Sequence, residues 1–214
     1  MNTMNPANPT GTLPKTAPGG LSALGLKLLA MALMLCDHLW ASVASDQAWL
    51  THIGRIAFPI FAFQIAEGFA RTHDRKRYLL RMLAFAAVSE IPFNLFYAGT
   101  AVYPFHQNVM FTFVLAILLL LGVEKFRAKG RIAYLLAAAA AVVLGYLLGT
   151  VTMVDYYGCG VVTVLLFYLC RGWKWGWLPE LAGLLYLNGV VLGGEDLTVF
   201  GATFPEQVLA VLAL

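Results

Sequence analysis

Charged side chains are scarce in this chain, because only 12% of its 214 residues are Asp, Glu, Lys or Arg while 60% are hydrophobic. So few polar groups cannot cover the surface of a water-soluble particle of this size. Cysteine is also rare, and Cys36, Cys159 and Cys170 all lie inside apolar runs. An odd number without a Cys-x-x-Cys pair predicts neither a disulfide framework nor a metal site.

Several common catalytic motifs are missing from the sequence. It contains no Gly-x-Ser-x-Gly, Walker loop, His-Glu-x-x-His or Gly-x-Gly-x-x-Gly. The sequence therefore gives no motif evidence for a soluble hydrolase, a nucleotidase, a metalloprotease or a dinucleotide-binding enzyme. No internal inverted repeat is visible either, and such a repeat would favour a transporter.

Long apolar runs are abundant, and each approaches the roughly 20 residues that a helix needs to cross about 30 Å of hydrocarbon. We predict an all-α, polytopic integral membrane helical bundle formed by a single domain over residues 21–214, after a disordered tail over residues 1–20. An eighth run begins at Phe204 and ends at Leu214, so it is predicted to be a truncated half-helix. The seven complete spans are predicted over residues 24–42, 48–70, 78–98, 107–123, 131–148, 154–170 and 175–192.

Basic residues alternate between the loops, which predicts the topology, since cytoplasmic loops carry an excess of Lys and Arg. The loops after the second, fourth and sixth predicted spans hold them, and the other loops hold no Lys or Arg. The amino terminus is therefore predicted to be cytoplasmic. The net charge of +3 is accounted for by this topology and by attraction to anionic membrane lipids, so no nucleic-acid partner is predicted.

Polar side chains interrupt the predicted spans, although a charged group at the membrane centre costs about 2.5–3.5 kcal/mol on insertion scales. Such residues usually face a bundle interior or a cavity, and Pro59 and Pro92 are expected to kink two of the helices. Gln64 and Glu67 are predicted to line an inner vestibule. The others gather from separate helices in the predicted outer half: Asp37, His38, Arg55, Glu90, Asn94, His106, Asn108 and Asp155.

The residue types in this outer group fit general acid–base chemistry. A histidine in a poorly hydrated cavity can act as a base. The unperturbed pKa of histidine is about 6.5, and desolvation together with a nearby acid can hold it near the working pH. Adjacent residues of a helix point about 100° apart, so Glu90 is a better candidate than Asp37 for orienting His38, whereas Asp37 can pair with Arg55. An arginine can hold a phosphate-bearing donor or a developing oxyanion. Acyl transfer and proton-coupled transport both remain open on these residues.

The strings GRIAFP, AEGF, SEIPF and QNVMFT follow one another between residues 54 and 112, and in this order and spacing the chain resembles the TraX family of membrane proteins. The resemblance is strongest over residues 24–123. It implies an acetyltransferase of the bacterial inner membrane, because the plasmid-encoded founder of the family acetylates the amino terminus of conjugative pilin. Relatives usually continue with further apolar spans, so a copy ending at Leu214 is expected to be truncated, inactive or completed by a partner chain.

By this resemblance the donor is acetyl-CoA and the acceptor is an amine or hydroxyl on an extracytoplasmic peptide, glycan or small amine. The implied catalytic base is His38, supported by Asp37 and Arg55, and the residue types themselves add Glu90 to this catalytic group. The predicted substrate-binding residues are Gln64, Glu67, Asn94, His106, Asn108 and Asp155. A small-solute transporter or channel, and a non-catalytic protein of pilus or envelope assembly, are the alternatives.

Overall fold

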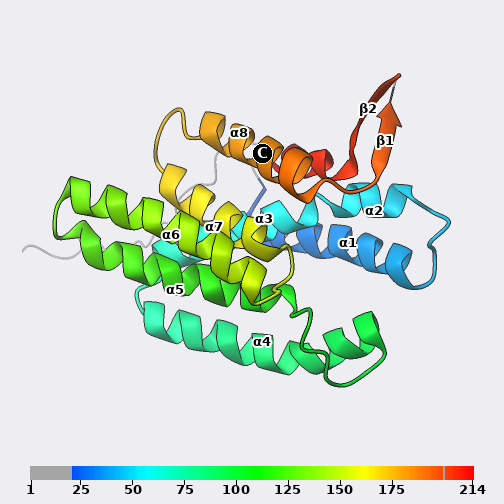
Figure 1. Ribbon diagram of the computed structural model, residues 1–214, viewed down its shortest axis with the longest axis horizontal. Coiled ribbons are helices and arrows are strands. Elements are labelled where there is room, and N and C mark those ends of the chain that lie inside the picture. The colour runs from blue at the N-terminus through cyan, green and yellow to red at the C-terminus, as the bar shows by residue number, and fades with distance from the viewer. Residues whose placement is uncertain (1–20, 200) are drawn as a thin grey trace, which may run out of the picture.

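The computed structural model describes residues 21–199 and 201–214, so the tail predicted over residues 1–20 lies outside the described residues. Its helices run largely alongside one another in a bundle (Figure 1). They are α1 (Ala23–Ser42), α2 (Trp49–Gly54), α3 (Ala57–Arg71), α4 (Arg75–Ala98), α5 (Val109–Arg127), α6 (Arg131–Val151), α7 (Tyr157–Cys170) and α8 (Trp177–Tyr186), which continues as the π-helical turn η1 (Leu187–Leu192).

These helices confirm the predicted membrane bundle. Counting α2 and α3 together, five helical segments are long and apolar enough to cross a membrane, and two further apolar helices are shorter. The shorter ones are α7 and the segment formed by α8 and η1. Each of the seven segments coincides with one of the seven predicted spans, with boundaries that differ by a few residues.

The second predicted span is interrupted between α2 and α3. Pro59 has no N–H, so the carbonyl of Arg55, four residues earlier, has no helical donor. The amide of Arg55 still bonds to the carbonyl of Thr51, which closes α2, and α3 begins afresh at Ala57. This interruption places Arg55 between two helices, where its side chain can reach residues of other elements.

The apolar core lies where α3, α5 and α7 meet. Phe69, Ile117, Leu120, Val164 and Leu165 are fully buried there. Because α7 is surrounded by other helices over much of its surface, little of it has to match the thickness of the lipid, which explains how a 14-residue helix fits within the bundle. In contrast, α1 and α4 are buried over only 6% and 11% of their apolar windows, so both lie at the periphery.

Helices α6 and α7 pack closely through their glycines. A Cβ added at Gly158 would lie 2.1 Å from the carbonyl oxygen of Tyr146, and one added at Gly149 would lie 2.8 Å from the backbone of Gly158. Only glycine allows this contact between backbones, as is usual where membrane helices pack closely. The contact fixes the start of α7, next to the loop that carries Asp155.

The carboxyl-terminal run differs from the predicted half-helix. Strands β1 (Asp196–Val199) and β2 (Ala202–Pro205) pair antiparallel, with Leu197 opposite Phe204. The apolar stretch that follows forms a 3-10 helix, η2 (Glu206–Ala213). Phe204 therefore lies in a strand, and Pro205 separates the hairpin from η2. The chain thus ends in a short helix that begins two residues later than the predicted run, and hydropathy alone did not register the Pro205 break or the hairpin before it.

The basic loops meet at one end of the bundle, where the α5–α6 and α7–α8 connections lie (Figure 1, left). There Glu67 forms ion pairs with Arg71 and Arg171, and Glu124 forms ion pairs with Arg75 and Arg127. The loops that are rich in Lys and Arg in the sequence thus lie together at one end of the bundle, and the loops between them lie at the other end. Which end faces the cytoplasm stays a prediction of the loop charges.

Candidate functional site

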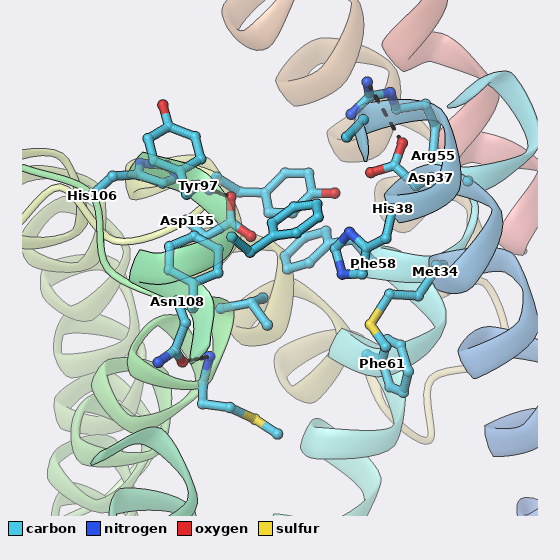
Figure 2. A pocket seen from close by; sticks show the side chains of 18 of the residues that line it. Met34, Asp37, His38, Arg55, Phe58, Phe61, Tyr97, His106, Asn108 and Asp155 are labelled. Carbon is cyan, nitrogen blue, oxygen red and sulfur yellow. Dashed lines mark hydrogen bonds and ion pairs between the residues drawn. The ribbon is translucent and has the colours of Figure 1, made fainter. Parts of the chain in front are cut away.

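A cavity of about 550 Å³ lies at the end of the bundle opposite the basic loops and is lined by residues of α1, the α2–α3 interruption, α4, the start of α5, the α6–α7 loop, η1 and η2. Figure 2 shows side chains pointing into it from both sides. Six of the ten predicted site residues line the cavity: Asp37, His38, Arg55, His106, Asn108 and Asp155.

One wall carries the predicted pair of Asp37 and Arg55. Their closest atoms, Oδ1 and Nη2, are 3.8 Å apart, and the hydroxyl of Thr51 joins them more tightly. It accepts a hydrogen bond from Arg55 Nη2 at 2.7 Å and donates one to Asp37 Oδ1 at 2.8 Å. Because Thr51 and Arg55 are four residues apart, they lie on the same face of α2. The pair is thus held by a bridging hydroxyl that the sequence did not single out.

The close approach of α1 and α2 at this wall depends on Gly54. A Cβ there would lie 2.5 Å from Asp37 Cβ and 3.1 Å from Asp37 Cα. We expect Gly54→Ala to push the helices apart and to lower the free energy of unfolding by about 1–3 kcal/mol, measured by thermal unfolding in detergent. The matched control is Gly122→Ala in α5, where an added Cβ meets nothing within 4 Å. Equal unfolding temperatures for the two variants would contradict the account.

His38 is the residue after Asp37, but the two side chains point in different directions. Figure 2 shows its imidazole directed into the cavity while Asp37 points toward Arg55. The ring lies 5.3 Å from the ring of Phe96 on α4, centroid to centroid. Within residues 21–199 and 201–214, no side chain hydrogen-bonds to the His38 ring. Its nitrogens are therefore left to bond to whatever enters the cavity.

The opposite wall carries His106 and Asp155. His106 Nε2 lies 3.6 Å from Asp155 Oδ1, and the imidazole stacks on Tyr97 with a centroid separation of 4.6 Å. Backbone hydrogen bonds between Gln107 and the α6–α7 loop hold the two chain segments together, since Gln107 N–H donates to Met153 and its carbonyl accepts from Asp155. A histidine–carboxylate pair thus faces His38 across the cavity.

Asn108 connects this wall to Glu90. The amide nitrogen of Asn108 donates to Glu90 Oε2 at 2.6 Å and to the carbonyl of Ala86 at 2.9 Å, while its oxygen caps α5 by accepting from Met110 N–H. Asn108 is only 3% exposed. Glu90 was expected to orient His38, but its hydrogen bonds go to the side chain and backbone of Asn108 instead.

The Asn108–Glu90 contact makes a specific prediction for Asn108→Asp. The variant keeps the helix cap, loses the amide donors and places two carboxylates together, so we expect a loss of about 1–3 kcal/mol in the free energy of unfolding. Adding Glu90→Gln should restore much of the loss, because the new amide can donate to the introduced carboxylate. Thermal unfolding of the single and double variants checks this, and a double variant less stable than Asn108→Asp would contradict it.

Three predicted residues lie apart from the cavity. Asn94 is buried and its amide nitrogen reaches the carbonyl of Ala101 at 3.5 Å. Gln64 contacts the carbonyl of Ala23, at 3.5 Å, and Glu67 is occupied by Arg71 and Arg171 at the basic end. The geometry thus gives Gln64 and Glu67 structural contacts in place of the predicted inner vestibule.

The sequence reasoning missed Glu206 and His52. Glu206 is 5% exposed and its Oε1 lies 3.1 Å from Arg55 Nη2, nearer than Asp37. Its other oxygen lies 3.2 Å from His52 Nδ1. The signal was present, because Glu206 is an acidic residue beside an apolar run, which is the criterion that identified Glu90 and Asp37.

The site therefore combines a free imidazole, a second histidine paired with a carboxylate, and a guanidinium held by two carboxylates. No group of three or more His, Cys, Asp or Glu side chains is positioned to hold a metal ion in the part of the chain that the structure describes. The arrangement is suited to moving protons to and from a substrate bound in the cavity.

Comparison with known proteins places the chain in a family. A family model described as TraX protein matches residues 22–212. The chain is 31% identical over 112 residues to the probable fimbrial assembly protein FimC, serogroup H1, of Dichelobacter nodosus, which covers 47% of the chain and 46% of that protein.

A second relative is protein TraX of Escherichia coli (strain K12), at 32% identity over 93 residues, or 42% of the chain and 36% of the relative. The alignments thus span less than half the length of either curated relative. No solved structure matches the chain. Because the family model covers nearly all of the described residues, the chain belongs to the TraX protein family.

Proposed function

We propose that this protein is a membrane acetyltransferase that moves an acetyl group from acetyl-CoA to an amine or hydroxyl of an acceptor. The observation that carries the proposal is the imidazole of His38, which has no hydrogen-bond partner among the described residues, in a cavity that also holds a fixed guanidinium. An accessible base beside fixed positive charge is the minimum that acyl transfer from a thioester requires. The family resemblance supports the same reaction class.

The proposed reaction begins when His38 takes a proton from the acceptor. The acceptor nitrogen or oxygen forms a bond to the thioester carbonyl carbon, and the negative charge on the carbonyl oxygen is stabilised by nearby donors such as Arg55. When the tetrahedral intermediate collapses, the carbon–sulfur bond breaks. The proton held by His38 goes to the departing sulfur, so the products are the acetylated acceptor and free CoA.

The charge around the cavity favours an amine over a hydroxyl. Four carboxylates lie in or beside it, and one guanidinium offsets them: Asp37, Glu90, Asp155 and Glu206 against Arg55. The field of these groups attracts a cationic ammonium. The ammonium loses one proton to water before it attacks, and the second proton that the amine gives up is the one that His38 passes to the departing sulfur. His106, paired with Asp155 across the cavity from His38, is positioned to bind such an acceptor.

The acceptor is proposed to be the amino terminus of a pilin or of another small membrane protein outside the cytoplasm. One relative is named as a probable fimbrial assembly protein, which supports a link to surface fibres. We place the protein in a bacterial inner membrane with its basic loops toward the cytoplasm, where they contact anionic lipids and the phosphates of acyl-CoA.

Binding of the donor tests the proposal with the protein purified in detergent. Acetyl-CoA should raise the apparent unfolding temperature, because a ligand present at 100 times its Kd adds about 2.7 kcal/mol of stability. Free CoA should act in the same direction and acetate should not. No shift at millimolar acetyl-CoA, in a preparation that unfolds cooperatively, would count against a transferase and in favour of a transporter or an assembly protein.

A further inference from the structure

Glu206 is the most deeply buried acidic residue beside the cavity, and each of its carboxylate oxygens has its own partner. Oε1 lies 3.1 Å from Arg55 Nη2 and Oε2 lies 3.2 Å from His52 Nδ1. Asp37 is 3.8 Å from the same Arg55 nitrogen. The principal counter-ion of Arg55 therefore comes from the carboxyl-terminal segment, more than 150 residues further along the chain, and not from α1.

The local structure makes Arg55 dependent on this partner. Arg55 lies at the interruption between α2 and α3, and its Nε is buried without a hydrogen-bond partner in the described part of the chain. The position of its guanidinium is set by the groups around Nη2, which are Thr51, Asp37 and Glu206. Removing Glu206, the nearer of the two carboxylates, leaves the guanidinium with a weaker and more distant ion pair to Asp37.

The backbone holds Glu206 in place from its own side. Its amide donates to the carbonyl of Glu195 at 2.8 Å, which ties the two ends of the β1–β2 hairpin together. Gly193 and Gly194 have positive φ values of 68° and 100°, a conformation that glycine adopts readily. These contacts bring η2 back against α2 and α3.

The same segment forms part of the cavity wall. Gln207, the next residue, lines the cavity together with Leu192. The side-chain oxygen of Gln207 is buried and has no hydrogen-bond partner among the described residues. A buried acceptor without a partner is costly unless a ligand or water satisfies it. The segment therefore supplies both a buried ion pair and an unsatisfied polar atom beside the cavity.

We propose that Glu206 is a positioning residue for acetyl transfer, which fixes the guanidinium of Arg55 at the cavity and makes the carboxyl-terminal segment a wall of the site. This inference rests on the proposed function. Glu206 acts through Arg55 and need not touch the substrate itself. The carboxyl-terminal segment is then required for the rate of transfer as well as for stability.

The kinetic test compares Glu206→Gln and Glu206→Asp with the wild-type protein. We expect Glu206→Gln to lower kcat by about 10²-fold, the loss typical of a misplaced catalytic group, with little change in the KM for acetyl-CoA. Glu206→Asp should recover part of kcat, because it restores the charge. Glu195→Gln is the control, since it removes the same charge from an exposed side chain of the same segment. Wild-type kcat in Glu206→Gln would overturn the inference.

A second measurement does not depend on activity. In a double-mutant cycle of Arg55→Leu and Glu206→Gln, unfolding temperatures should be non-additive, because each single variant removes the partner of the other. An additive cycle would overturn the inference. A wild-type protein that is folded but transfers no acetyl group would contradict the proposed function alone, since the cycle still reports the contact between Arg55 and Glu206.

Discussion

Replacing His38 with alanine is expected to lower acetyl transfer by about 10²- to 10⁴-fold, the range that general acid–base catalysis contributes in other enzymes. The imidazole enters the cavity from α1 and has no hydrogen-bond partner among the described side chains. Its removal therefore breaks no side-chain hydrogen bond among the described residues and loses the ring contact with Phe96. We expect the unfolding temperature and the binding of acetyl-CoA to change little.

The measurement is the single-turnover rate of transfer from labelled acetyl-CoA to an amine acceptor, with thermal unfolding run in parallel. His73→Ala is the matched control, because His73 is in the loop between α3 and α4, outside the cavity. If His38→Ala transferred acetyl at the wild-type rate, His38 would lose the role of base. His106 would then be the next histidine to test, since it lies on the opposite wall with Asp155.

Arg55→Leu is expected to lower the free energy of unfolding by about 3–5 kcal/mol, the usual cost of removing one partner from a buried ion pair. Glu206, which is 5% exposed, would lose the guanidinium and keep only His52, and Asp37 would keep only the hydroxyl of Thr51. Arg55→Lys keeps the charge but not the planar group that reaches Thr51 and Glu206 together, so its stability should fall between those of the wild type and the leucine variant.

Thermal unfolding in detergent measures these losses. Arg131→Leu is the control, since Arg131 is exposed at the start of α6 and an exposed charge contributes little to stability. If Arg55→Leu unfolded at the same temperature as Arg131→Leu, the three-way contact of Asp37, Arg55 and Glu206 would have no energetic importance. The role of Glu206 as a positioning residue would then also lose its basis.

The bundle and much of the cavity were predictable from the sequence for a physical reason. An apolar run of sufficient length in a membrane forms a helix because every backbone polar group must be satisfied internally. Ionisable residues inside such runs avoid lipid and meet one another, as Asp37 and Arg55 do. The sequence also indicated that residues of separate helices, such as His38 and Asp155, would lie around one site.

The partners of individual residues were less predictable. Glu90 and Asn94 are four apart and share a helix face, but spacing does not reveal that Glu90 bonds to Asn108 or that Asn94 turns to Ala101. The Asn94–Ala101 contact depends on the path of the loop after α4. The Glu90–Asn108 contact depends on the relative positions of separate elements, which no local pattern encodes. The contact of Glu206 with Arg55 is of the same kind.

The fold of the carboxyl-terminal segment could not be predicted from hydropathy. The residues from Phe204 onward form an apolar stretch, yet Pro205 ends a strand there and the rest winds into η2. The fold of this segment depends on the hairpin and on the buried ion pair of Glu206, both of which join distant parts of the chain. Average hydropathy predicted that the segment is apolar, but it did not predict the hairpin or the 3-10 helix.

The most direct test of the central claim is transfer of a radiolabelled acetyl group from acetyl-CoA to a peptide amino terminus by the purified protein in liposomes. We predict that the wild-type protein labels the peptide and that the His38→Ala variant, folded to the same extent, labels it at least about 10²-fold more slowly. A folded wild-type protein that labels no amine, or equal labelling by both proteins, would contradict the claim that His38 is the base of an acetyltransferase.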